Sequence, residues 1–360
     1  MKRPNFIKHW KEVESPEQVR PPVMNEPFGY IAEFAPATGM SHLRVAHLRL
    51  PPGVRSHPPI ASRDEDVFFF VLEGAPDLWV DGHLYPLKEG DGICFPARTG
   101  IAHSILNNTP NEVRLFLMSE AMRYLSKFAH PVDAAAGDNL QKMGKLWTDA
   151  PSRKLGPHDG QTDANRNGPY PASARKKKRP DFVAHWRDIL EKKAGTYPKS
   201  KEQHGLDALF GRRARFSRIG VHFEVLKPGR RTSWPHAERD EEEFVYVVSG
   251  RIDAWNDGHI TKMGEGDFIG WEAGIGVTHV LINNSNDDAM LIVGGEASRA
   301  RNQFWYPFHP KRNREVGALY WADHPKVKLG PHDGLPDALR AAKKATKKRV
   351  TRKKKRTKRR

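Results

Sequence analysis

The chain has 360 residues, and its 60 Lys and Arg against 43 Asp and Glu give a net charge of +17. Residues 340–360 contain 14 of the basic residues and no acidic one, so the rest of the chain is close to neutral. This distribution excludes a uniformly basic nucleic-acid-binding domain. The single cysteine, Cys94, excludes an internal disulfide and a cysteine-based metal cluster. No apolar run could span a bilayer and the first residues lack an apolar signal segment, so we expect a cytoplasmic protein.

The sequence repeats itself after about half its length. The segment RPNFIKHW (3–10) returns as RPDFVAHW (179–186), and GIAHSILNN (100–108) returns as GVTHVLINN (276–284), both at an offset of 176. KLGPHDG occurs in both halves as well. A period this long indicates duplication of a whole domain. We therefore predict a first domain, a Pro-, Gly- and Lys-rich linker, a second domain and a basic tail, at 1–164, 165–178, 179–339 and 340–360.

Each half has the pattern of short strands. VFFFVL (67–72) and EFVYVV (243–248) are rich in β-branched and aromatic residues. Asp-Gly pairs at 81–82 and 257–258 separate strand-like segments, as in two-residue hairpin turns. Many short strands with Gly-rich turns predict a barrel or sandwich in each half. Short helices are expected outside the barrels, near 120–128 and 185–193.

Four polar residues of the second half are candidate metal ligands. His236 and Glu238 are two residues apart, so on a strand their side chains share a face. Glu243 opens the next apolar strand, and His279 lies on a distant one. Two imidazoles with one or two carboxylates suit one divalent ion, and this set does not discriminate between Fe, Mn, Ni and Zn. Three roles are open for Glu238: it coordinates the metal, it contacts a coordinating residue without binding the metal itself, or it takes no part and leaves a site of three ligands.

These residues resemble the two sequence motifs of the cupin superfamily. Glu243 and Gly250 have the spacing of the first motif, and Glu238 stands where that motif has its second histidine. The first half matches the second motif at Gly90, Pro96, His103 and Asn107. The resemblance implies an all-β dominated bicupin, with jelly-roll barrels at about 45–120 and 221–297 and a few flanking helices. It also implies that the second barrel holds the metal. The composition of the basic tail, residues 340–360, predicts that it is disordered.

The first half lacks most of the corresponding ligands. The equivalents of the four candidates are Ile60, Ser62, Val67 and His103. His57 precedes position 60 by three residues, so on a continuous strand it would face the other way. One imidazole cannot retain a divalent ion, and we predict that this barrel is free of metal. Asn283 recurs as Asn107 in this half, which favours a structural role for both.

Two functions follow from this sequence. The first is a metal-dependent enzyme that acts on a small molecule in the second barrel, with a dioxygenase-, isomerase- or decarboxylase-like reaction. Its catalytic residues are not identified, except that Glu238 or Glu243 could accept a proton if it is not a ligand. Tyr246, Trp255 and Trp271 are candidates to line its pocket.

The alternative is a non-catalytic module that binds a small ligand and contacts nucleic acid or another polyanion through the 340–360 tail. The tail has no aromatic residues, so such binding would be independent of base sequence. For either function the resemblance implies that the chain can form a homodimer.

Overall fold

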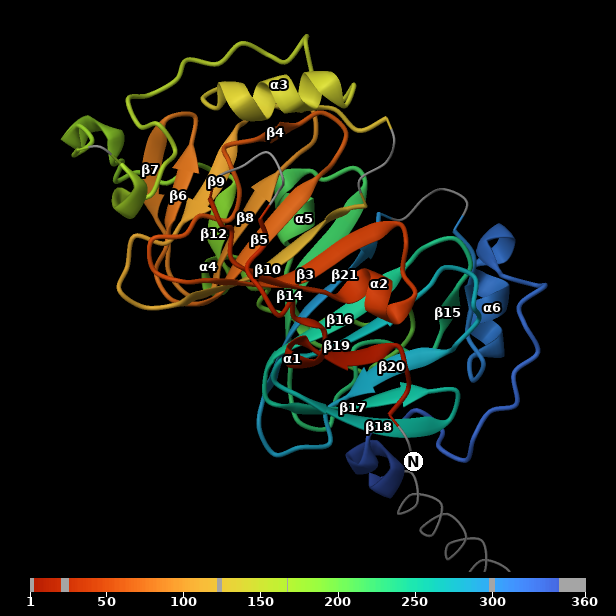
Figure 1. Cartoon of the computed structure of the whole chain (residues 1–360). Coiled ribbons are helices and arrows are strands. Elements are labelled where there is room, and N and C mark those ends of the chain that lie inside the picture. The colour runs from red at the N-terminus through yellow and green to blue at the C-terminus, as the bar shows by residue number, and fades with distance from the viewer. Residues whose placement is uncertain (1–2, 21–25, 122–124, 167, 298–301, 343–360) are drawn as a thin grey trace, which may run out of the picture.

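The computed structural model describes residues 3–20, 26–121, 125–166, 168–297 and 302–342 (Figure 1). Its strands form two barrels that pack side by side, each with a six-stranded sheet, a three-stranded sheet and a two-stranded ribbon. The predicted all-β double barrel with few helices is thereby confirmed. Most of the basic tail, residues 343–360, lies outside the described residues, so the prediction of polyanion binding stays a prediction.

The first barrel has the strand order β12-β8-β5-β10-β3-β2 in its large sheet and β7-β6-β9 in its small sheet, with β11 and β4 as the ribbon. Its own strands are β2 (Tyr30–Glu33), β3 (Leu43–Leu50), β4 (Ala61–Ser62), β5 (Val67–Glu73), β6 (Asp77–Val80), β7 (His83–Pro86), β8 (Asp91–Phe95), β9 (His103–Leu106), β10 (Val113–Glu120) and β11 (Phe128–Ala129).

The second barrel repeats this topology, with the order β1-β19-β16-β21-β14-β13 in the large sheet, β18-β17-β20 in the small sheet, and β15 with β22 as the ribbon. Its own strands are β13 (Leu206–Ala208), β14 (Ile219–Leu226), β15 (Ala237–Glu238), β16 (Glu243–Ser249), β17 (Arg251–Asn256), β18 (His259–Gly264), β19 (Asp267–Trp271), β20 (His279–Ile282), β21 (Ala289–Glu296) and β22 (Phe304–Trp305).

Both predicted Asp-Gly hairpins are present. Asp81 and Asp257 have φ values of 45° and 47°, and the glycine that follows each is also in the left-handed region. Two residues with positive φ give a turn whose twist matches that of the flanking strands. The turns join β6 to β7 and β17 to β18.

The helices are short and lie outside the barrels. They are α1 (Trp10–Val13), α2 (Phe34–Thr38), α3 (Ala134–Lys142), α4 (Trp186–Ile189), α5 (Phe210–Ala214) and α6 (Pro310–Glu315). The helix expected near 185–193 is present as α4. Of the segment expected to be helical near 120–128, residues 122–124 lie outside the described residues, residue 120 ends β10, and residues 125–128 contain a turn and the start of β11. The next helix along the chain is α3. None of the helices in the described residues has the length and apolar character that a bilayer span requires.

The two halves exchange their first strands. β1 (Ile7–His9), near the start of the chain, pairs with β19 of the second barrel. In the same way β12 (Val183–His185), which follows the linker, pairs with β8 of the first barrel. The repeated RPxFxxHW segments therefore complete each other's sheets, and each barrel needs the other half of the chain.

A shared aromatic core fills the space between the barrels. Phe34 stacks on Phe268 with ring centres 4.4 Å apart, and Phe70 stacks on Phe223 at 5.3 Å. Tyr246 belongs to the same cluster. Because all of these side chains are buried, the contact resembles the interior of one domain more than a mobile domain interface.

Two buried carboxylates, at equivalent positions of the two halves, accept hydrogen bonds across this interface. Glu242 accepts hydrogen bonds from the backbone N–H groups of Ser41, His42 and Leu43 of the first half, at 2.6–3.0 Å. Asp66, its counterpart, accepts from residues 217 and 218 of the second half, both at 2.9 Å. Hydrogen bonds to an ionised acceptor are stronger than neutral ones and repay the burial of the charge.

The Glu242 contact can be tested by its neutral analogue. We expect Glu242→Gln to lower the free energy of unfolding by about 2–3 kcal/mol, because an amide N–H would face backbone N–H groups. Denaturation in urea measures the change, and Glu265→Gln on the exposed surface is the matched control, expected within about 0.5 kcal/mol of the parent. Equal stability of both variants would contradict a fastening role for Glu242.

Candidate metal centre

Three of the four predicted ligands come together inside the second barrel. His236 lies just before β15 and forms a β-bridge with His279, the first residue of β20. Glu243 is the first residue of β16. The Nε2 atoms of His236 and His279 lie 3.5 Å and 2.8 Å from the same oxygen of Glu243. The donor atoms of these three residues all lie within 4.8 Å of one another, as the ligands of one small ion require.

The other ring nitrogen of each histidine is occupied. Nδ1 of His236 donates to the carbonyl oxygen of Trp234 at 2.8 Å, and Nδ1 of His279 donates to that of Val277 at 3.0 Å. A carbonyl oxygen only accepts, so Nδ1 carries the proton in both rings. Such bonds fix the ring orientation and leave Nε2 to a metal. Trp271 also stacks on the ring of His279 at 3.8 Å. The residues therefore fit a divalent first-row ion.

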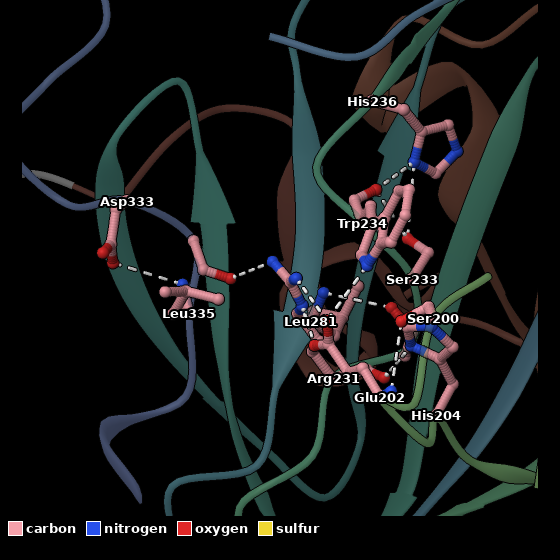
Figure 2. Close-up of polar contacts among 12 residues, drawn as sticks. Ser200, Glu202, His204, Arg231, Ser233, Trp234, His236, Leu281, Asp333 and Leu335 are labelled. Atoms are coloured by element: carbon pink, nitrogen blue, oxygen red, sulfur yellow. Dashed lines mark hydrogen bonds and ion pairs between the residues drawn. The ribbon is translucent and has the colours of Figure 1, made fainter. Parts of the chain in front are cut away.

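A network behind His236 holds the segment that carries it (Figure 2). The indole N–H of Trp234 donates to Glu202 at 3.0 Å, and Arg231, almost fully buried, donates to both oxygens of the same carboxylate. Arg231 also donates to the carbonyl oxygen of Gly334. The first half keeps the arginine, as Arg55 with Glu26, but has a proline at position 58 where the second half has Trp234. The hydrogen bond that joins this network to the segment carrying His236 is therefore a feature of the second barrel and has no counterpart at position 58 of the first.

Glu238 lies beside the three-residue group and is not part of it. One of its oxygens lies 3.7 Å from Nε2 of His236, and the other accepts a hydrogen bond from Asn302 at 2.8 Å. Of the three roles left open by the sequence, this geometry fits a group that supports the site from the side.

Burial and mutual charge set the ionisation of the group. Burial acts to raise the pKa of Glu243, but hydrogen bonds from His236 and His279 outweigh it, and the pKa lies well below its usual range. For His236 burial acts to lower the pKa, but the nearby carboxylates of Glu238 and Glu243 raise it well above the usual value. Burial and the charge of Glu243 raise the pKa of Glu238. The site therefore keeps one firmly ionised carboxylate between two imidazoles.

The group opens on a cavity of about 310 Å³. Of the three aromatic candidates, Trp271 is among its lining residues, and Tyr246 and Trp255 are not. Tyr246 is three residues after Glu243, so strand alternation turns it into the core between the barrels. Trp255 alternates with inward-facing neighbours on β17 and donates its indole N–H to the carbonyl oxygen of His332.

Several other residues of the cavity were not anticipated from the sequence, namely Tyr197, His222, Glu224, Thr232, Ser233, Phe304 and Tyr306. Tyr197 and Tyr306 lie in segments outside the motif regions, where the sequence gives no signal. His222 and Glu224 read as an ordinary polar strand face, although their first-half counterparts, Ala46 and Leu48, are apolar.

The first barrel keeps one of the equivalent residues in place. His103 is buried and stacks on Phe95, as His279 does on Trp271. His57 lies outside β4 and turns its ring toward His103, at 5.3 Å, so the expected opposite orientation is wrong for this residue. No third donor accompanies the pair among the described residues. The side-chain amides of Asn107 and Asn283 each donate to two carbonyl oxygens, one at the end of a strand and one in a loop, which fits their expected structural role.

Comparisons with known proteins agree with this architecture. The family model of the cupin domain matches residues 46–119 and again residues 222–294. Oxalate decarboxylase from Lactobacillus farciminis, solved as a formate complex, superposes with a TM-score of 0.50 at 16% identity, over 84% of this chain and 89% of that one. A mutant of salicylate 1,2-dioxygenase from Pseudoaminobacter salicylatoxidans, solved in complex with gentisate, gives 0.53 at 14% identity, over 81% of each chain. No curated protein matches the sequence.

The chain thus consists of two tandem jelly-roll barrels, and the second barrel contains a group of residues that could coordinate a metal ion. The cupin domain model matches each barrel, and the chain has the two-barrel architecture of a bicupin.

Proposed function

We propose that the second barrel is the centre of a metal-dependent enzyme acting on a small molecule. The observation that carries this proposal is the convergence of His236, Glu243 and His279 on one point at the wall of a cavity. These three residues would hold the ion. When bound, a divalent metal supplies Lewis-acid chemistry, and iron or manganese supplies redox chemistry as well.

The surrounding residues have separate tasks in this proposal. Asn302 donates to one oxygen of Glu238, and the other oxygen lies on the cavity side, 3.7 Å from Nε2 of His236, where it can accept or hold a proton. The backbone carbonyls of Trp234 and Val277 keep both imidazoles oriented. Tyr197, Tyr306 and Trp271 form aromatic walls that exclude water and favour a flat ligand.

The charge of the cavity narrows the substrate class. No Lys or Arg is among its lining residues, all of which belong to the described part of the chain, whereas Glu224, Glu238 and Glu243 are. A small dianion such as oxalate would lack a counter-charge other than the metal. The proposed substrate is therefore a small ring-bearing molecule with at most one negative charge. This favours a dioxygenase- or isomerase-like reaction over decarboxylation of a dicarboxylate.

The ligand assignment is tested by comparing two histidines at equivalent positions. We expect His279→Ala to weaken the binding of Mn(II) at this centre at least about 100-fold, because a direct ligand is lost. His103→Ala, the matched control in the first barrel, should leave metal content unchanged. Elemental analysis of the reconstituted full-length proteins measures both, and equal metal retention would refute the assignment.

Glu238 and Glu243 should differ in the same assay. Glu243→Gln is expected to abolish stoichiometric metal at this centre, since the shared carboxylate becomes a neutral amide. Glu238→Gln should change the affinity by no more than about tenfold, as for a group that supports ligands without binding the ion. Comparable losses in the two variants would mean that Glu238 is a fourth ligand.

The substrate class is tested by thermal unfolding of the Mn(II)-loaded protein. At millimolar concentration we expect salicylate or gentisate to raise Tm by about 2 °C or more, and oxalate to raise it by less than about 1 °C. Metal-free protein should show neither shift. The proposed class fails if oxalate is the better stabiliser.

A further inference from the structure

A second group of ionisable side chains lies inside the same barrel. Asp207 on β13 pairs directly with Glu224 on β14, and His222 is two residues before Glu224, on the same face of that strand. His222 and Glu224 line the cavity that also holds the His236–Glu243–His279 centre. The group belongs to different strands from that centre and shares no residue with it.

The donor atoms of this group also lie close to one another. Nε2 of His222 lies 3.9 Å from an oxygen of Asp207 and 3.7 Å from Oε2 of Glu224. One imidazole nitrogen and two carboxylate oxygens thus lie within 4.8 Å of one another. Their separations exceed normal hydrogen-bond length, which leaves room for an ion between them.

Glu224 is the residue that most requires a partner. Its side chain is only 4% exposed, and its Oε1 atom makes no hydrogen bond of normal geometry. A buried carboxylate oxygen without a partner is costly, and a bound cation would remove that cost.

The first barrel shows that the fold does not need polar groups here. At the same offset of 176, Asp207, His222 and Glu224 correspond to Ile31, Ala46 and Leu48. The strand register is identical, because Ile31 pairs with Leu48 as Asp207 pairs with Glu224. In the first barrel these three residues simply pack in the apolar core. The first barrel, which lacks most equivalents of the His236–Glu243–His279 group, therefore also lacks the equivalents of this second group.

We propose that Asp207, His222 and Glu224 bind a second divalent cation in the cavity of the second barrel. A set of two carboxylate oxygens and one imidazole nitrogen suits Mn(II), Fe(II) or Zn(II). This site goes beyond the proposed function, since it needs neither the first metal nor turnover to exist.

The first barrel supplies the residues for a test. The triple variant D207I/H222A/E224L carries the apolar side chains that the same fold already packs in the first half. Full-length proteins are stripped with a chelator, titrated with Mn(II), and followed by equilibrium dialysis and by the electron paramagnetic resonance of free Mn(II). We expect two Mn(II) ions per chain in the parent, one in the triple variant, and one in His279→Ala. Thermal unfolding of each variant verifies folding, and His222→Asn is the milder replacement if the triple variant does not fold.

The outcomes separate the two sites. If the parent binds one ion that His279→Ala loses and the triple variant keeps, the second site is overturned and the group is an internal ion pair. If the parent binds one ion that only the triple variant loses, the second site stands and the first assignment fails. Two ions retained by both the triple variant and His222→Asn would also overturn the proposal.

Discussion

The exchange of first strands between the two halves is the constraint on which the structure depends. β1 closes the large sheet of the second barrel and β12 closes that of the first, so neither sheet is complete within its own half. Edge strands that are paired in this way expose no free backbone groups on that side. The aromatic core between the barrels then becomes fully buried, and the two domains form one packed unit.

This interface also positions the candidate metal centre. Glu242 is held by three backbone N–H groups of the first half, and the next residue, Glu243, starts strand β16 on the opposite face. Alternation along the strand therefore sends one carboxylate to the interface and the next to the cavity. The first barrel uses the same device for Asp66 but has Val67 in place of the inward carboxylate. The first half thus acts as a rigid support for the site, while its own interior is apolar at the equivalent positions.

Much of this arrangement could be predicted from the sequence, and the reasons for the failures are physical. The convergence of His236, Glu243 and His279 follows from motif spacing, since two-residue alternation and a family pattern both place them inward. Tyr246 was expected in the pocket because its residue type alone does not reveal which face of the strand it occupies.

The exchanged strands have no local sequence signal, because a short strand such as Ile7–His9 pairs equally well with either sheet edge. The paired histidine and glutamate at 222 and 224 were missed because His-x-Glu on a strand, taken alone, is typical of a solvated face. Aligned with Ala46 and Leu48, the pair marks two inward positions at which one copy of the duplicated sequence is apolar and the other ionisable.

Burying three carboxylates and three imidazoles in one small barrel opposes folding, because each charge loses solvation that only a partner or a cation restores. The exchanged strands and the shared aromatic core join the second barrel to the first, whose interior is apolar at the equivalent positions. In this duplicated fold one copy has ionisable groups at positions where the other copy is apolar. Such a difference is expected at residues that are retained for function and not for folding stability.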